Sequence, residues 1–121
     1  MPADISSYDK GVAAEKRAVM QLRLQGYRIL AERYKTKFGE IDIIARKGNT
    51  ICFVEVKAHK RLQSSLEAVT AKSRRRIEQA ALWFISEHPE LADLGMRFDV
   101  MAFKSGGIWA EHLDNAWMAG T

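Results

Sequence analysis

The sequence contains a single cysteine, Cys52, and no long apolar run. One cysteine excludes an intramolecular disulfide and any zinc site built from several cysteines. A transmembrane helix needs about 20 consecutive apolar residues, and the apolar runs here are far shorter. The first residues also lack the basic-then-apolar order of a signal peptide. These absences predict a reduced, cytoplasmic protein that has no membrane partner.

The chain also lacks internal repeats, low-complexity tracts and linkers. Its 121 residues predict a single domain, 1–121, with an ordered core at about 9–117. There are 19 Lys and Arg against 15 Asp and Glu, which gives a net charge of +4. A basic balance favours an anionic partner, and nucleic acid is the commonest partner of that kind.

The spacing of apolar residues predicts the element order α-β-β-β-α-β-β. Gly26 and Pro89 mark the ends of the two long helices. A strand meander followed by a crossover helix implies a mixed five-stranded sheet with helices packed on it, which is an α/β fold. The expected elements are helices over about 9–25 and 70–87, the second preceded by a short helical turn, and strands over 27–34, 41–46, 51–58, 97–103 and 108–113.

The second and third strands form a predicted hairpin that carries charged residues. The Gly48-Asn49 pair suits a two-residue loop with glycine at the first central position. That loop fixes the register of the hairpin and places Asp42 opposite Glu55 and Glu40 opposite Lys57. Directly opposed side chains have Cβ atoms about 4.5–5.5 Å apart. We therefore expect these charged groups to meet.

Facing carboxylates such as Asp42 and Glu55 repel each other unless a positive charge lies between them. Mg²⁺ or Mn²⁺ would resolve that repulsion, because a hard divalent cation takes carboxylate oxygens and leaves positions for phosphate. Lys57 shares the strand face of Glu55 and could hold a water or stabilise developing negative charge. The alternative is a solvated outer face. Ile51 and Phe53 also share this face, which favours packed surroundings and a metal site.

Glu15 is a further carboxylate in an unusual position. It falls in the apolar stripe of Val12, Val19 and Leu22 on the first helix, at spacings of three, four and seven residues. A carboxylate on a core-facing stripe needs a partner. Glu15 therefore either completes the metal site or lies at the edge of the stripe.

Asp42 followed by Glu55-Val56-Lys57 after a short hairpin resembles the signature of the PD-(D/E)XK nuclease superfamily. The wider sequence is similar to the YraN family of small bacterial proteins, from about residue 11 to 117. The blocks that carry this resemblance are "GVAAEKRA", "GYRIL", "GEIDIIARKGNTICFVEVK", "EAVTAKSRRRIEQAALWFI" and "RFDVMAF".

The resemblance implies a restriction-endonuclease-like fold close to that of archaeal Holliday junction resolvases. It implies that Asp42, Glu55 and the Val56 carbonyl bind the metal ion, that Lys57 assists the attacking water, and that Glu15 matches a first-helix glutamate of the resolvases. The implied activity is Mg²⁺- or Mn²⁺-dependent endonuclease cleavage of DNA, favoured over RNA, with branched or structured DNA as substrate. It also implies a homodimer, because resolvase-like enzymes dimerise to cut two strands.

Basic residues lie close to this motif in the sequence. Lys72, Arg75 and Arg76 share one face of the second long helix by three-and-four spacing. With Lys57, Lys60 and Arg61 they would form a basic rim that binds phosphates without reading sequence. The alternative for the helix is an ordinary solvated face.

Other residues lead to weaker or alternative predictions. We expect Trp83 and Phe84 to be core residues and not platforms for base stacking. Asp99 is either a strand-edge residue or a support for the site. The basic balance, and His59 where YraN relatives usually carry arginine, favour a second function, a non-catalytic nucleic-acid-binding protein that retains the nuclease fold. A protein-interaction adaptor is a third alternative.

Overall fold

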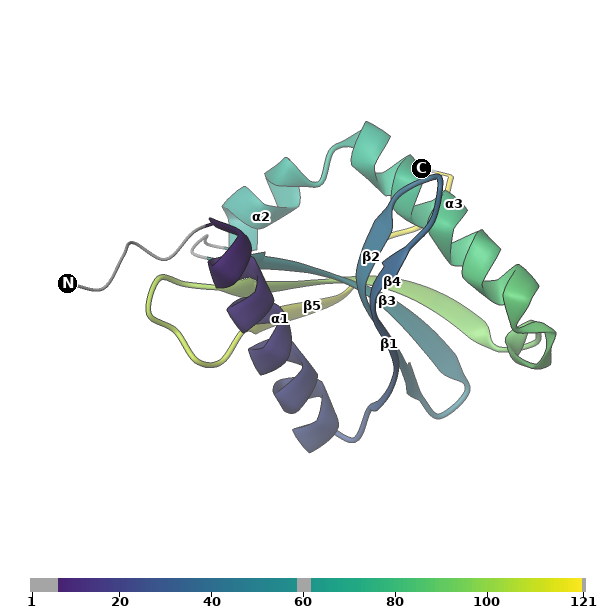
Figure 1. The fold of residues 1–121 in the computed structure, drawn as a ribbon, viewed down its shortest axis with the longest axis horizontal. Coiled ribbons are helices and arrows are strands. Elements are labelled where there is room, and N and C mark those ends of the chain that lie inside the picture. The colour runs from purple at the N-terminus through teal and green to yellow at the C-terminus, as the bar shows by residue number, and fades with distance from the viewer. Residues whose placement is uncertain (1–6, 59–61, 121) are drawn as a thin grey trace.

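The computed structural model describes residues 7–58 and 62–120, which form a five-stranded sheet with helices on both faces (Figure 1). The strand order is β1-β2-β3-β4-β5; β3 and β4 run parallel, and the other neighbours run antiparallel. The predicted α/β class and mixed sheet are thus confirmed. The elements are α1 (Ser7–Leu24), β1 (Arg28–Lys35), β2 (Glu40–Lys47), β3 (Thr50–Ala58), α2 (Leu62–Ala68), α3 (Ala71–Glu87), the 3-10 turn η1 (Pro89–Leu91), β4 (Gly95–Phe103) and β5 (Glu111–Trp117).

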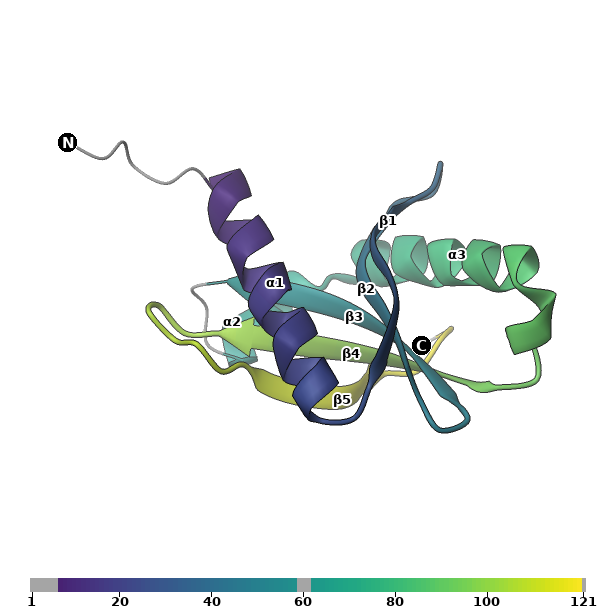
Figure 2. The same cartoon turned by 60° about the horizontal axis from the view of Figure 1, so that its bottom comes forward.

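Helices α1 and α3 cover opposite faces of the sheet (Figure 2). Alternation along β2 directs Ile43 toward α1 and Ile44 toward α3. The core on the α1 side consists of Ala14, Ala18, Val19, Leu22, Ile43, Ala45, Cys52, Val54, Met101, Phe103 and Ala110. The core on the α3 side includes Ile41, Ile44, Ile51, Phe53, Ile77, Ala80, Ala81, Phe84, Phe98, Val100 and Trp117. None of the helices in the described part of the chain is both long and apolar enough to span a bilayer.

The β2–β3 hairpin has the predicted loop and register. Gly48 occupies the first loop position with φ of 60°, a conformation that glycine adopts without strain. Lys47 pairs with Thr50, and the ladder continues to Ile43 opposite Val54. The paired ladder ends there, so the predicted pairs of Asp42 with Glu55 and Glu40 with Lys57 lie beyond it.

The last strand lies further along the chain than predicted. The sequence favours a strand over 108–113, but β5 covers Glu111–Trp117 and pairs with β4 from Ala102 opposite Glu111. Ile108 and Trp109 have the composition of a strand, yet they lie in the connection and are 78% and 54% exposed. Trp117 is buried instead and stacks on Phe98 with ring centroids 5.1 Å apart.

Candidate functional site

Strands β2 and β3 separate at Asp42. In an unbroken ladder the backbone N–H of Val56 would bond to Ile41, two positions beyond the last pair on each strand. Val56 N instead donates to Asp42 Oδ2 at 2.8 Å. The N–H and C=O of one strand residue point to the same side of the strand. The Val56 carbonyl therefore also points to the side of the strand on which Asp42 lies.

Three carboxyl groups from three elements gather at this separation. Burial raises the pKa of Glu55 on β3 well above its usual range, and a hydrogen bond to Asp42 and repulsion by its charge add to that rise. Burial also raises the pKa of Glu15 on α1 to about 7, and Asp42 again adds to the rise through its charge. Asp42 on β2 is thus the common neighbour of both. Asp42 and Glu55 lie close together as expected, and Glu15, for which the sequence left two positions open, lies near Asp42.

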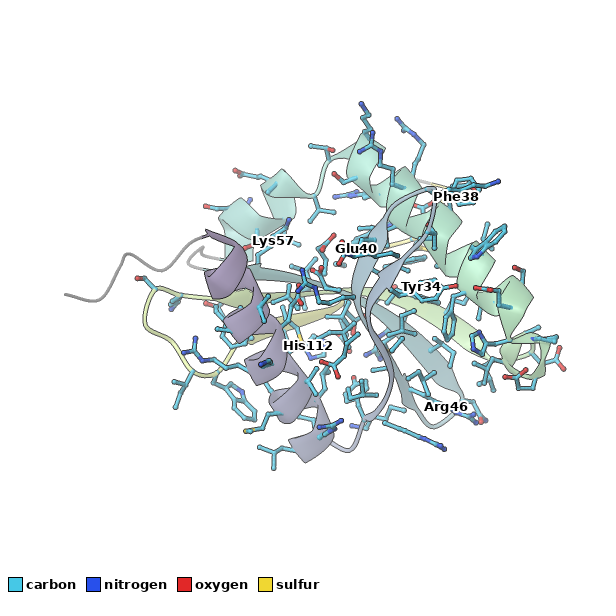
Figure 3. The ribbon with its side chains drawn as sticks, viewed as in Figure 1. Tyr34, Phe38, Glu40, Arg46, Lys57 and His112 are labelled. Atoms are coloured by element: carbon cyan, nitrogen blue, oxygen red, sulfur yellow. The ribbon has the colours of Figure 1, made fainter. Side chains whose placement is uncertain are left out.

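Lys57 lies beside Glu55, as strand alternation predicts. It is half-buried on β3, and its ammonium charge opposes the rise in the pKa of Glu55. Figure 3 shows Lys57 and Glu40 on either side of the region between α1 and β2. Glu40 lies near Arg33 instead of pairing with Lys57, because the strands have already separated at this level.

Arg33 is a site residue that the sequence analysis missed. Its Nε lies 3.5 Å from Glu15 Oε2 and 3.6 Å from Glu40 Oε1. Its backbone has φ of 51°, a left-handed conformation that costs a non-glycine residue free energy and clusters at functional sites. The β1–β2 register brings Arg33 level with Asp42. A charged residue inside a predicted strand was the available signal, but only the register reveals which carboxylates it faces.

The carboxyl groups are the kind of ligand that a hard divalent cation binds. Their oxygens do not converge on a common point that could hold one. Among residues 7–58 and 62–120, no group of three or more His, Cys, Asp and Glu side chains could hold a metal ion as it stands. Carboxylate oxygens are the ligands that Mg²⁺ and Mn²⁺ prefer. The raised pKa values of Glu15 and Glu55 mean that these groups keep their protons to a higher pH than an ordinary glutamate, and a bound cation would favour their charged forms.

The stability of the metal-free protein should fall as the pH rises from about 5 to 8. The folded-state pKa of Glu15 is about 7 against an ordinary 4.5, so its contribution is complete below the lower value and lost as the pH passes the upper one. The loss should be on the order of 2 kcal/mol, with Glu55 acting in the same direction. Urea unfolding in EDTA at a series of pH values measures it.

Glu15→Gln should flatten this pH profile, because glutamine cannot ionise. Glu90→Gln, at an exposed acid in η1, provides the matched control and should leave the profile unchanged. Asp99 does not interfere, since its pKa is lowered and it titrates below this window. A wild-type profile that stays level between pH 5 and 8 would show that these carboxyls do not repel one another.

The predicted phosphate-binding residues that the structure describes are exposed. Lys72, Arg75 and Arg76 all lie on the surface of α3. Arg76 lies against the β1–β2 turn, because a Cβ added to Gly39 would be 3.3 Å from Arg76 Cβ. Arg75 instead lines a cavity next to the C-terminal end of β5, so the two arginines point in different directions. The predicted partners Lys60 and Arg61, and His59, lie outside the described residues.

Asp99 is a fully buried carboxylate within β4, which excludes the strand-edge interpretation. Its oxygens accept hydrogen bonds from Arg97 at 2.9 Å, His112 at 2.8 Å and the Asn115 backbone N–H at 3.0 Å. Burial alone would raise the pKa of Asp99, but these hydrogen bonds hold it below its usual value. Arg97 also donates to the Tyr27 hydroxyl at 2.6 Å. The network joins β4 and β5 to the segment after α1.

The sequence of the chain matches a known protein family over most of its length. Residues 14–103, which include both motif strands and α3, match the model of Uncharacterised protein family UPF0102. The chain belongs to this family. UPF0102 proteins are the YraN family, so the predicted family is confirmed.

The UPF0102 relatives match nearly the full chain. One from Mesorhizobium japonicum is 45% identical over 111 residues, covering 92% of this chain and 88% of the relative. One from Parvibaculum lavamentivorans is 42% identical over 113 residues, covering 93% and 84%. One from Rhodopseudomonas palustris is 42% identical over 120 residues, covering 99% and 92%.

Proposed function

We propose that the protein is a metal-dependent nuclease that hydrolyses phosphodiester bonds of DNA, with branched or structured DNA as its substrate. One observation carries the proposal: at the point where β2 and β3 separate, Asp42 takes the Val56 N–H, and the carboxyls of Glu15 and Glu55 lie next to it. Charged groups with only a structural role would be expected to form a pair of opposite charges that stabilises the folded protein. Burial and the neighbouring charge of Asp42 raise the pKa values of Glu15 and Glu55, so this arrangement destabilises the folded protein at neutral pH, which is a cost that a functional site accepts.

The likeness to the PD-(D/E)XK superfamily is part of the same proposal. The motif residues Asp42, Glu55 and Lys57 lie on adjacent antiparallel strands joined by a two-residue loop. The next strand, β4, runs parallel to β3 after a helical crossover. These features support a restriction-endonuclease-like fold with the motif at the point where two central strands diverge.

Each residue would have a defined role in hydrolysis. Asp42, Glu55 and the Val56 carbonyl would hold Mg²⁺ or Mn²⁺, which when bound neutralises charge on the phosphate and activates water. Lys57 would donate a hydrogen bond to the attacking water or to the developing oxyanion. Glu15, with a pKa raised to about 7, would accept a proton near neutral pH. Arg33 restrains the Glu15 and Glu40 carboxylates.

The proposal predicts cleavage that depends completely on a divalent cation. The purified protein should cut a four-way junction or a flap in Mg²⁺ or Mn²⁺ and should cut nothing in EDTA. Linear duplex, single-stranded DNA and an RNA duplex complete the panel and define the substrate. Calorimetric titration with Mn²⁺ should give measurable heat. Absence of both cleavage and Mn²⁺ binding across this panel would overturn the proposal.

A second candidate is a nucleic-acid-binding protein without catalysis. It is favoured by the absence of a ready-made metal-binding group among the described residues and by the exposed Lys72, Arg75 and Arg76 on α3. Binding would then weaken steeply with salt, need no metal, and persist when Asp42 is replaced by asparagine. These three properties together, without cleavage, would favour the second candidate.

A further inference from the structure

An exposed aromatic pair lies at the β1–β2 turn, and its first residue is four residues before Asp42 along the chain. Phe38, in the β1–β2 turn, and Trp83, on α3, are 36% and 42% exposed, and their ring centroids are 6.1 Å apart in an edge-to-face arrangement. The sequence predicts core positions for both Trp83 and Phe84. That prediction is confirmed for Phe84, which is buried, and wrong for Trp83.

Positive charge accompanies these rings. Lys37 Nζ lies 5.3 Å from the centroid of the Phe38 ring and 5.5 Å from that of Trp83. Trp83 follows Arg76 by seven residues, so the two side chains lie on one face of α3, two turns apart. The exposed patch therefore combines two aromatic rings, a lysine whose ammonium lies over them, and an arginine on the same face of α3.

A separate set of contacts also attaches β1 to α3. Tyr34, on the same strand as the turn, packs edge-on against Phe84 with ring centroids 5.3 Å apart, and its hydroxyl donates to Glu87 on α3. These contacts already hold β1 against the helix. Phe38 and Trp83 are only partly buried, whereas Phe84 is buried.

The turn that carries Phe38 is held in one conformation. Thr36 Oγ1 accepts the backbone N–H of Phe38 at 3.0 Å and of Gly39 at 3.1 Å, and Thr36 N donates to Gly39 O at 2.9 Å. Gly39 is also close to Arg76, where an added Cβ would be only 3.3 Å from Arg76 Cβ. A surface held in its binding conformation loses little entropy when a ligand binds.

The patch lies within reach of the carboxyl groups. Phe38 precedes Asp42 by four residues, and four residues of extended chain span at most about 14 Å. That length corresponds to roughly four nucleotides at 3.4 Å per nucleotide. Figure 3 shows Phe38 at the tip of the β1–β2 connection, next to α3, and Glu40 lower on the same connection.

We propose that Phe38 and Trp83 form a stacking platform for an unpaired base of single-stranded DNA, with Lys37 and Arg76 contacting the adjacent phosphates. Every base has an apolar face, so stacking on aromatic residues tolerates any sequence and strengthens binding by roughly 5- to 150-fold per base. This inference rests on the proposed nuclease function, since it specifies that the substrate has a single-stranded segment close to the cleaved bond.

Binding in EDTA tests the platform independently of catalysis. Fluorescence anisotropy with a labelled oligo(dT) and with a blunt duplex should show that Phe38→Leu and Trp83→Leu each weaken binding of oligo(dT) by about 10-fold, with little change for the duplex. Trp109→Leu is the matched control: Trp109 is 54% exposed in the β4–β5 connection, away from α3 (Figure 1), and its loss should change neither affinity. Lys37→Gln should reduce the slope of log affinity against log salt concentration by about one, because one contact with a phosphate is lost.

Tryptophan fluorescence gives a direct second readout. In a Trp109→Phe background the remaining tryptophans are Trp83 and the buried Trp117. Binding of oligo(dT) should then quench the emission of the exposed Trp83, and this variant keeps the platform intact if a leucine variant fails to fold. Oligo(dT) binding without quenching, or equal loss of oligo(dT) and duplex binding in the leucine variants, would overturn the platform.

The platform and the nuclease can fail separately. A protein that binds oligo(dT) through these rings but cuts no DNA in Mn²⁺ would contradict the nuclease alone. A protein that cuts DNA but binds oligo(dT) equally well with leucine at positions 38 and 83 would contradict the platform alone. Where both hold, the cut should fall within about four nucleotides of the stacked base.

Discussion

Replacing Asp42 with asparagine should lower the rate of Mg²⁺-dependent DNA cleavage by about 10³-fold or more, the largest effect on activity that we expect. Asparagine keeps the size of the side chain and an oxygen that can accept the Val56 N–H, which Asp42 Oδ2 accepts at 2.8 Å. It removes the negative charge that would bind the cation, and a catalytic cation contributes several kcal/mol to the stabilisation of the transition state. Single-turnover cleavage of a labelled junction measures the change.

The same variant should become more stable at pH 8 without metal. Asp42 raises the pKa values of both Glu15 and Glu55, so its neutralisation relieves repulsion on two sides. A variant that is more stable and yet inactive cannot owe its inactivity to unfolding. Glu32→Gln, at an exposed acid of the same sheet on β1, should leave both cleavage and stability nearly unchanged. Cleavage by Asp42→Asn at the wild-type rate would instead show that these carboxyls are not catalytic.

The sequence predicted the hairpin well because its determinants are local. Gly48 accepts the left-handed conformation that a two-residue loop requires, and this loop fixes the register of every later pair. Strand alternation then places Glu55 and Lys57 on one face. The end of strand pairing after Ile43 and Val54 could not be predicted from the sequence. It depends on the Asp42 carboxylate, which accepts the Val56 N–H in place of a backbone carbonyl of β2.

Residues that act through tertiary contacts were harder to predict. Arg33 reaches Glu15 from another element because its backbone adopts a left-handed conformation, which nothing in the local sequence requires. Trp83 stands next to the buried Phe84 and was assigned to the core by its composition. Helical spacing is the better guide to its exposure. Trp83 follows Arg76 by seven residues, or two turns, so both lie on the same exposed face of α3.

Replacing the buried Asp99 with alanine should destabilise the fold by about 3–5 kcal/mol, the largest effect on stability that we expect. The change leaves Arg97 and His112, whose side chains are 22% and 12% exposed, facing a space without an anion. It also removes the acceptor of the Asn115 N–H at a position where the backbone has φ of 52°. Urea unfolding at pH 7 measures the loss.

Asp114 provides a control on the same arginine. Its Oδ2 lies 3.9 Å from Arg97 Nη1, and its side chain is 68% exposed. Asp114→Ala should therefore cost no more than about 1 kcal/mol, because exposed ion pairs contribute little. Equal losses in the two variants would mean that Asp99 acts as an ordinary surface charge, in conflict with its burial.

The acid limb of the stability profile separates Asp99 from the carboxyl cluster. The pKa of Asp99 is lowered from an ordinary 3.8, so its stabilisation is present above that value and is lost as the pH falls below it. Glu15 and Glu55 act in the opposite direction, because their raised pKa values remove stability as the pH rises toward 8. Asp99→Ala should therefore reduce the loss of stability below pH 4 and leave the loss between pH 5 and 8 in place. Asp42→Asn should do the reverse, which assigns one network to holding the fold and the other to the proposed chemistry.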